Sequence, residues 1–269
     1  MTDRPFREHV VILTGAARGM GRAMALQLAD QGAWLALADL PQSDLNGVVD
    51  ECHRRGGEAV AIPTDVSDEA QCARLVAQTI EAFGRVNVLI NNAGITMWAL
   101  FEELEGLRPL ERIMQVNYFG TVYCTFYALP HLKQTAGRII AISSVSSLTG
   151  VPYRSGYSAS TSAVAGFFNS LRIELEEYGV SVSLVFPNLV VTETDKQAFG
   201  ADGKPVGRTL LQESKVMTAD DAAAIILDTG ARRKRQAIMT LRGKLAPWVK
   251  LVAPGVVDRV AARAIKSGP

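Results

Sequence analysis

The chain has 269 residues, of which 48% are hydrophobic and 20% are charged, so it is long enough for one large globular domain with a sizeable core. The formal net charge of +1 gives no support for a nucleic-acid partner. Three scattered cysteines fit neither a disulfide framework nor a metal site. Because such cysteines suit a reducing compartment and no signal peptide or membrane helix is evident, we expect a cytoplasmic protein.

Apolar runs alternate with helical patterns along the first third of the chain. Buried strands are expected at 10–14, 33–39, 56–65 and 85–94. Helices are expected at 19–32, from a cap at Ser43 to about Arg55, and from Asp68 to about Phe83.

The alternation continues through the rest of the chain. A long helix is expected from about Leu110 to Lys133, a fifth strand at 137–144, a helix at 156–178 and a sixth strand at 179–187. An irregular stretch at 187–217 follows, then a helix from Thr218 to Leu227 and a last strand at 236–240. The tail at 243–269 has a helical pattern, with breaks expected at Pro247 and Pro254.

Strands that are apolar throughout and alternate with helices predict a parallel sheet covered on both faces. The fold class is therefore α/β, a single-domain doubly wound sheet of the Rossmann type over residues 1–269. Ligands of such sheets bind beyond the carboxyl ends of the strands. We therefore expect functional residues at 14–21, 39, 65, 91–95, 143–157 and 187–217.

The stretch TGAARGMG, residues 14–21, lies between a predicted strand and a predicted helix. Gly15 permits a tight turn, and Gly19 and Gly21 let backbone amides approach a pyrophosphate at the positive end of the helix. A plain strand–helix turn is the alternative, because a glycine loop alone is a weak signal.

Asp39 ends the second strand, about 20 residues beyond the last of these glycines. A carboxylate there accepts hydrogen bonds from ribose hydroxyls and repels a 2′-phosphate, which favours NAD over NADP. Arg18 favours NADP, because a basic residue in the loop can reach that phosphate. A turn residue before Pro41 is the alternative role of Asp39.

Several further motifs make the chain resemble the short-chain dehydrogenases/reductases over about residues 8–195. The glycine pattern is similar to the TGxxxGxG of this family, and NNAG at 91–94 is similar to its second signature. Ser144 precedes Tyr157 by 13 residues, which is the serine–tyrosine spacing of the family. The stretch FPNLVVTET resembles the family's PGxVxT, with Asn188 in place of the glycine.

The resemblance implies oxidation of an alcohol or reduction of a carbonyl with NAD(P), with hydride chemistry supplied by the cofactor. It implies catalytic positions at Asn117, Ser144, Tyr157 and Thr161, with Tyr157 as acid/base and Ser144 orienting the substrate oxygen. No metal is expected. The cofactor positions that it implies are Gly15, Arg18, Gly19, Met20, Gly21, Asp39, Asp65, Val66, Asn92, Ala93, Gly94, Tyr157, Pro187, Val190 and Thr192.

Thr161 departs from the family pattern, which has a lysine one helical turn after the tyrosine. A free phenol titrates near pH 10, so a nearby cation is needed to stabilise the phenolate at neutral pH. Three interpretations stay open: an enzyme altered at one position, an active enzyme that compensates, and a nucleotide-binding or scaffolding protein without turnover. We expect weak or absent turnover and partly retained cofactor binding.

The expected substrate pocket is mostly apolar, which favours a hydrophobic alcohol or ketone. The stretch 187–217 is expected to form a mobile lid, or else to be disordered. Apolar and basic residues alternate in the tail, which is expected to cover a neighbouring subunit or the pocket mouth, with contact to a membrane surface as the less favoured alternative. The resemblance implies a homodimer or homotetramer. The expected pocket residues are Ile95, Thr96, Met97, Trp98, Ser144, Val145, Leu148, Val151, Tyr153, Leu189 and Phe199.

Overall fold

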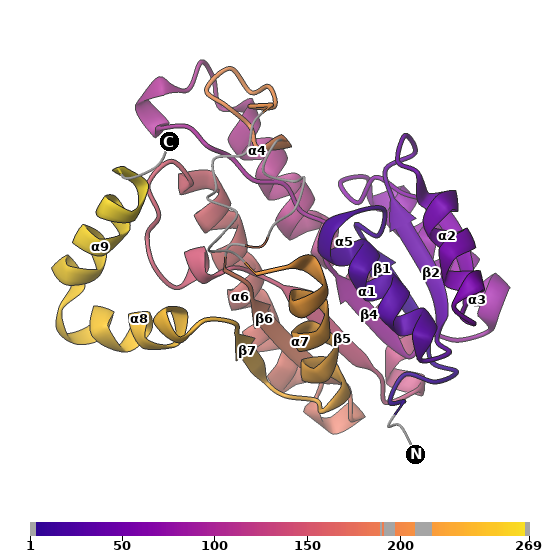
Figure 1. Cartoon of the computed structure of the whole chain (residues 1–269). Helices are drawn as coiled ribbons and strands as arrows, with labels where there is room; N and C mark the ends of the chain where they lie inside the picture. The colour runs from indigo at the N-terminus through magenta and orange to yellow at the C-terminus, as the bar shows by residue number, and fades with distance from the viewer. Residues whose placement is uncertain (1–3, 189, 191–196, 208–216, 267–269) are drawn as a thin grey trace.

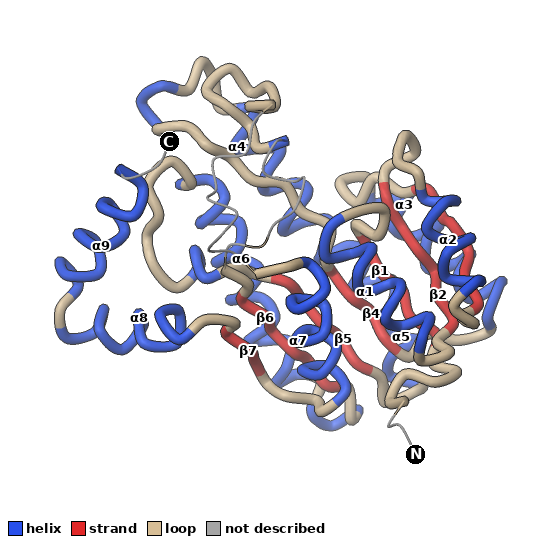
Figure 2. Tube along the Cα trace, in the orientation of Figure 1, coloured by secondary structure: helices blue, strands red, loops and turns tan. Residues whose placement is uncertain are grey.

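The computed structural model describes residues 4–188, 190, 197–207 and 217–266. Within these residues, seven strands form one parallel sheet in the order β3-β2-β1-β4-β5-β6-β7 (Figures 1 and 2). This arrangement confirms the predicted doubly wound α/β fold. The strands are β1 (Val10–Thr14), β2 (Trp34–Asp39), β3 (Glu58–Pro63), β4 (Val88–Asn91), β5 (Arg138–Ile142), β6 (Ser181–Phe186) and β7 (Gln236–Ile238).

Helices cover both faces of the sheet and enclose two apolar cores. Helices α1 (Gly19–Asp30), α2 (Leu45–Arg54) and α7 (Ala219–Ala231) pack on one face. Helices α3 (Glu69–Phe83), α5 (Gly120–Gln134) and α6 (Ser155–Glu174) pack on the other.

Alternate residues of each central strand point to opposite faces, as strand geometry requires. In β1, Leu13 joins the core beneath α1 and Ile12 joins the core beneath α5. In β2, Leu37 lies on the first face and Ala38 on the second. All of these residues are fully buried, which explains why the strands are apolar throughout.

Two helix starts differ in how well the sequence predicted them. Asp68 caps α3 as expected, since its side chain accepts a hydrogen bond from the amide of Gln71. The cap predicted at Ser43 is wrong, because Asp44 caps α2 and accepts from the amide of Gly47. The Ser43 hydroxyl instead donates to Asp39 Oδ1 over 3.0 Å.

The long helix predicted from Leu110 to Lys133 is divided by a π-helical turn. It consists of α4 (Arg108–Met114), the π-turn η2 (Gln115–Phe119) and α5. Asn117 lies in the π-turn and is buried. Such turns widen a helix locally and are frequent at functional sites.

The predicted helix at 156–178 is α6 followed by the 3₁₀ turn η4 (Glu176–Tyr178), and further 3₁₀ turns lie at η1 (Phe101–Glu103) and η3 (Val145–Ser147). In the irregular stretch, the described residue Val190 forms a bridge with Met217, and Phe199 forms one with Met97. The remainder of the predicted lid, 189, 191–196 and 208–216, lies outside the described residues.

The tail forms α8 (Leu241–Val252) and α9 (Pro254–Lys266). A break at Pro254 is confirmed, but the break expected at Pro247 is wrong, since α8 continues through it. The absent amide of Pro247 removes one helical hydrogen bond, while Thr240 caps the start of α8 by accepting from the amide of Gly243.

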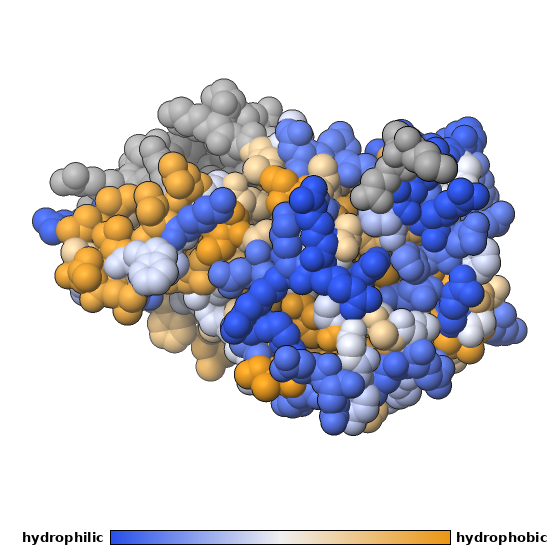
Figure 3. Space-filling model, turned by 90° about the horizontal axis from the view of Figure 1, so that it is seen from below, coloured by the Kyte–Doolittle hydropathy of each residue, from blue (hydrophilic) through white to orange (hydrophobic). Residues whose placement is uncertain are grey.

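Helices α8 and α9 expose apolar side chains that form part of the hydrophobic surface at one end of the molecule (Figure 3). None of the described tail residues lines the cavity beyond the carboxyl ends of the strands, so cover of its mouth by the tail stays a prediction. Among the described residues, no helix combines the length and apolarity needed to cross a membrane. The exposed residues are Leu241, Leu245, Trp248, Val249, Leu251, Val252, Val256 and Val260.

Candidate active site

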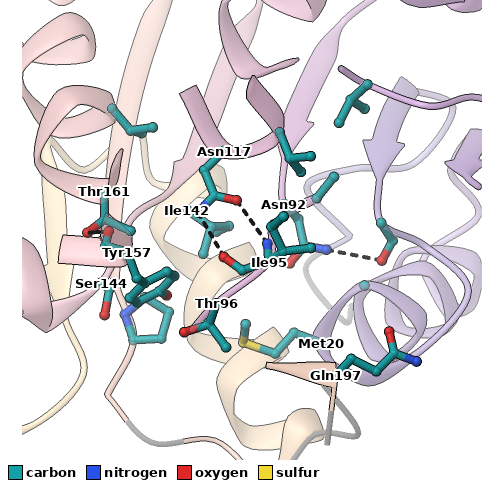
Figure 4. A pocket seen from close by; sticks show the side chains of 18 of the residues that line it. Met20, Asn92, Ile95, Thr96, Asn117, Ile142, Ser144, Tyr157, Thr161 and Gln197 are labelled. Atoms are coloured by element: carbon teal, nitrogen blue, oxygen red, sulfur yellow. Dashed lines mark hydrogen bonds between the residues drawn. The ribbon is translucent and has the colours of Figure 1, made fainter. Parts of the chain in front are cut away.

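A cavity of about 360 Å³ lies beyond the carboxyl ends of the strands, where the fold predicts a ligand site. Figure 4 shows Ser144, Tyr157 and Thr161 on one side of it and Met20 and Gln197 on the other. All of the described catalytic and cofactor residues expected from the sequence, except Gly19, line this cavity. These are Gly15, Arg18, Met20, Gly21, Asp39, Asp65, Val66, Asn92, Ala93, Gly94, Asn117, Ser144, Tyr157, Thr161, Pro187 and Val190.

The glycine loop depends on backbone positions that exclude side chains. Gly15 has a φ of +67°, and a Cβ there would lie 2.9 Å from the Cα of Ala93. A Cβ on Gly21 would lie 1.8 Å from the carbonyl oxygen of Gly15. The loop can therefore bring the N-terminus of α1 close to a ligand, where helical amides and the helix dipole favour phosphate groups.

Hydrogen bonds join this loop to the segment after β4. The Thr14 hydroxyl accepts from the amides of Asn92 and Ala93, both over 3.0 Å. The Asn92 side chain donates to the carbonyls of Thr14 and Gly15 over 3.0 and 3.1 Å. The two segments consequently form one wall of the cavity.

Asp39 presents a fixed negative charge at the end of β2. Its Oδ2 accepts from the amide of Ala17 over 2.9 Å, and its Oδ1 accepts from the amide of Leu40 and from the hydroxyl of Ser43. Each oxygen of a carboxylate has more than one acceptor site, so Asp39 can still accept from ligand hydroxyls.

Asp65 is held in an ionic network after β3. Burial raises the pKa of its carboxyl, but hydrogen bonds from Ser67 and Arg112 outweigh this effect, and the pKa lies below its ordinary value. Arg112 Nη2 lies 3.0 Å from Asp65 Oδ2. Arg112 lines the cavity and was missed by the sequence analysis, because only the fold brings α4 to the segment after β3.

Asn117 connects the cavity wall to the helix that carries Tyr157. Its Oδ1 accepts from the amide of Ile95, and its Nδ2 donates to the carbonyl of Ile95 (Figure 4). The same Nδ2 also donates to Ser160 Oγ. Ser160 Oγ in turn donates to the carbonyl of Tyr157. The side chain of Asn117 therefore fixes the spacing between α6 and the segment after β4.

Tyr157 and Ser144 line the same part of the cavity, and Ser144 is buried. The amide of Ser146 donates to Ser144 Oγ over 3.2 Å, which leaves the Ser144 hydroxyl proton for a ligand. Thr161 is 4% exposed, and its hydroxyl can donate to the carbonyl of Tyr157 over 3.0 Å. The Thr161 hydroxyl is thus hydrogen-bonded to the backbone of its own helix, and its side chain brings no charge to the cavity.

The expected pocket residues fall into two groups. Ile95, Thr96, Ser144 and Phe199 line the cavity. Of the others, Trp98 and Tyr153 stack on each other with ring centroids 5.7 Å apart, and Met97 is buried in a small core with Ile113. Val145 and Leu148 pack against the core on the α6 side, and Val151 is half-buried. Among the expected cofactor residues, Gly19 does not line the cavity. Leu189 and Thr192 lie outside the described residues.

Arg154 is a second lining residue that the sequence analysis missed. Its guanidinium carbon lies 4.8 Å from the centre of the Trp98 ring and 5.9 Å from the centre of the Tyr157 ring. Its position three residues before the tyrosine was the available signal. The described residues contain no group of three or more His, Cys, Asp or Glu side chains that could hold a metal ion.

Comparison with known proteins identifies the family. Residues 9–202 match the family model described as short chain dehydrogenase. The chain belongs to this family of NAD(P)-dependent oxidoreductases.

Individual relatives and solved structures agree with this assignment. The chain is 42% identical to 11-beta-hydroxysteroid dehydrogenase-like 4A of Arabidopsis thaliana over 67% of its own length and 60% of that protein. It is 33% identical to 11-beta-hydroxysteroid dehydrogenase A of Sesamum indicum over 93% of its length and 74% of that protein. A Burkholderia phymatum short-chain dehydrogenase/reductase, solved in complex with NAD, is similar with a TM-score of 0.81 and 26% identity over 95% of this chain and 96% of that one.

Gly21→Ala tests whether the glycine loop binds a dinucleotide. The added Cβ would collide with the Gly15 carbonyl and displace the loop. We expect dinucleotide binding, measured by NADH fluorescence, to weaken at least about 10-fold, because about 1.4 kcal/mol of strain in the loop is enough to lower the affinity by this factor. Gly166→Ala is the matched control, since a Cβ there meets no atom within 4 Å. Equal binding by both variants would contradict this role of the loop.

Proposed function

We propose that this protein is an NAD(P)-dependent oxidoreductase that interconverts a hydrophobic secondary alcohol and its ketone, with Tyr157 as the acid/base. The observation that carries the proposal is one cavity that contains both the glycine loop and the Ser144–Tyr157 pair. Members of the matched family supply the general reaction class, and the side chains of this cavity fit it.

The residues around the cavity suit a bound dinucleotide. The amides at the start of α1 would bind its pyrophosphate, Asp39 would bind the adenosine ribose, and Asp65 with Val66 would line the adenine site. When bound, the nicotinamide accepts or supplies the hydride.

Ser144 and Tyr157 would handle the proton of the reaction. The Ser144 hydroxyl would donate to the substrate oxygen and hold it beside the phenol. During oxidation, Tyr157 would accept the proton of the alcohol as a phenolate, and during reduction it would return that proton to the carbonyl oxygen. Asn117 would keep α6 at the correct distance through its bonds to Ile95 and Ser160.

The proton transfer requires a phenolate, and Thr161 does little to stabilise it. A phenol titrates near pH 10, whereas a threonine hydroxyl contributes no charge. Because the Thr161 hydroxyl is turned to the backbone of its own helix, we infer slow oxidation at neutral pH. The same observation favours the second candidate function, a dinucleotide-binding protein of this fold without turnover.

The walls of the substrate side support an apolar substrate. Ile95 and Phe199, two of the expected pocket residues, contribute hydrophobic side chains to the cavity. Several relatives are named hydroxysteroid dehydrogenases, and a steroid is a rigid apolar alcohol of the expected kind. The chain spans 60% of the length of the first of these relatives, so the substrate class is part of the proposal.

Thr161→Lys and Tyr157→Phe together test the proposed chemistry. A lysine at 161 places an ammonium one helical turn from Tyr157, so we expect faster oxidation of hydrophobic alcohols at pH 7, by up to about 10²-fold. Tyr157→Phe should lower kcat/KM by about 10²- to 10⁴-fold in either background. Activity is followed as NADH formation over a panel of alcohols.

Retained dinucleotide binding with no turnover by the wild type or by Thr161→Lys would contradict the enzyme proposal. That result would support the binding-protein alternative. Turnover that survives Tyr157→Phe would contradict the role of the tyrosine.

We propose NAD as the preferred cofactor, because the Asp39 carboxylate lies where a 2′-phosphate would approach. Asp39→Asn removes the negative charge and keeps the shape of the side chain. The repulsion between this carboxylate and a nearby 2′-phosphate exceeds about 1.4 kcal/mol, which corresponds to about 10-fold in binding. We therefore expect the ratio of NADP to NAD binding constants to shift towards NADP by at least about 10-fold. Asp44→Asn, five residues on and exposed, is the matched control. An unchanged ratio would contradict the proposed role of Asp39.

We also propose that the chain forms a homodimer or homotetramer through α5 and α6. Each helix leaves a large apolar side chain in solvent, with Phe126 67% and Ile173 69% exposed. Phe126→Glu and Ile173→Glu should lower the molar mass measured by light scattering after size exclusion, whereas Phe101→Glu, outside both helices, should not. A monomeric wild type would contradict the proposal.

Flotation with lipid vesicles tests separately whether the tail contacts a membrane surface.

A further inference from the structure

The described residues around Tyr157 contain a cation that can replace the missing charge at position 161. We propose that the Arg154 guanidinium stabilises the deprotonated, phenolate form of Tyr157. This inference rests on the proposed function, in which Tyr157 acts as the acid/base. It assigns Arg154 to the proton-transfer machinery and predicts turnover with threonine at position 161.

The geometry brings the guanidinium to the tyrosine ring inside the cavity. The Arg154 Cζ lies 5.9 Å from the centre of the Tyr157 ring, and both residues line the same space as Ser144. Arg154 precedes Tyr157 by three residues and Thr161 follows it by four, so the three side chains fall along one face of the start of α6. Arg154 thus places a positive charge on the N-terminal side of Tyr157, whereas Thr161 places none on the C-terminal side.

The surrounding structure holds Arg154 in this position. Tyr153 has a φ of +64°, a left-handed conformation that costs about 1 kcal/mol or more for a bulky residue. The carbonyl of Tyr153 accepts from the amide of Ala99 over 3.1 Å, and its ring stacks on Trp98. Trp98 also lies 4.8 Å from the Arg154 guanidinium, a cation–π contact. The strained turn and the Trp98 ring together aim the guanidinium into the cavity.

Arginine suits this role because its guanidinium stays charged through the whole working range of pH and stacks on aromatic faces. Tyr157 is also the third residue of α6, so the positive end of the helix dipole adds to the effect of Arg154. The guanidinium carbon lies 5.9 Å from the centre of the Tyr157 ring, and a positive charge at such range favours the anionic form and lowers the pKa of a phenol.

The other charged groups that line the described cavity lie nearer the opposite end of the sheet. Asp39 and Asp65 follow β2 and β3, three and four strands from β5, which Ser144 follows. At the usual spacing of strands, the ends of β2 and β3 lie at least about 14 Å from the end of β5. Arg112 pairs with Asp65, and Arg18 lies in the loop after β1, two strands from β5. Among these five charged groups, Arg154 is therefore the one best placed to act on the tyrosine.

The test is a direct titration of Tyr157 in the protein without substrate. The chain has six tyrosines, so the ultraviolet titration of each protein is compared with that of its Tyr157→Phe counterpart to isolate one phenol. We expect Arg154→Met to raise the pKa of Tyr157 by about 1 to 2 units and Arg154→Lys to raise it less. Arg172→Met, on the same helix about four turns further along, should leave it unchanged.

The Thr161→Lys background makes the test more specific. There the lysine supplies a second cation, so Arg154→Met should raise the kinetic pKa of alcohol oxidation by less than it does with Thr161. A merely structural role would lower activity in both backgrounds and leave the pH profile in place. A substrate-binding role would raise KM without moving the kinetic pKa.

An unchanged Tyr157 pKa in Arg154→Met, with the fold intact by circular dichroism, would overturn the inference. So would equal shifts in both backgrounds. The titration needs no turnover, so it still tests Arg154 if the proposed function fails for want of a substrate.

Discussion

The close approach of two backbone segments is the constraint on which the site depends. The carbonyl of Gly15 fills the space of a Cβ on Gly21, and the backbone of Ala93 blocks a Cβ on Gly15. The Thr14 hydroxyl and the Asn92 side chain then join the loop to the segment after β4. This junction orients the start of α1 towards the cavity. From the same segment, Ile95 is tied to Asn117 and through it to α6, so one chain of contacts connects the glycine loop with the tyrosine.

Electrostatics decides what this arrangement can do. A phenol at the start of a helix gains some stabilisation as an anion, but a neutral hydroxyl at position 161 adds no charge. The structure pairs this deficit with a guanidinium that packs on Trp98 beside the tyrosine ring. At the other end of the cavity, the Asp39 carboxylate is held by the amide of Ala17, and in the proposed function it repels the 2′-phosphate of NADP. Dinucleotide binding and proton transfer would therefore depend on separate groups of residues in one cavity.

The sequence alone predicted the sheet, its helices and most of the cavity wall, because strand periodicity and glycine spacing are local signals. Gly15 and Asp39 were found in this way, whereas Ser144 was found from the serine–tyrosine spacing of the family that the chain resembles. Arg112 and Arg154 were missed, since their place in the cavity depends on the contact of α4 with Asp65 after β3 and on the left-handed turn at Tyr153. The cap at Ser43 was wrong because the helix begins one residue later, where the Asp44 carboxylate accepts from the amide of Gly47. The break at Pro247 was wrong because a helix survives the loss of one hydrogen bond.

A single-turnover measurement tests the central claim most directly. The wild-type protein is saturated with NAD and mixed with a hydrophobic secondary alcohol that carries either hydrogen or deuterium at the carbinol carbon. The account predicts that NADH absorbance rises to an amount proportional to the protein, more slowly with the deuterated alcohol and faster at alkaline pH. Saturating dinucleotide binding with no NADH formed at any pH, from any alcohol of the panel, would contradict it.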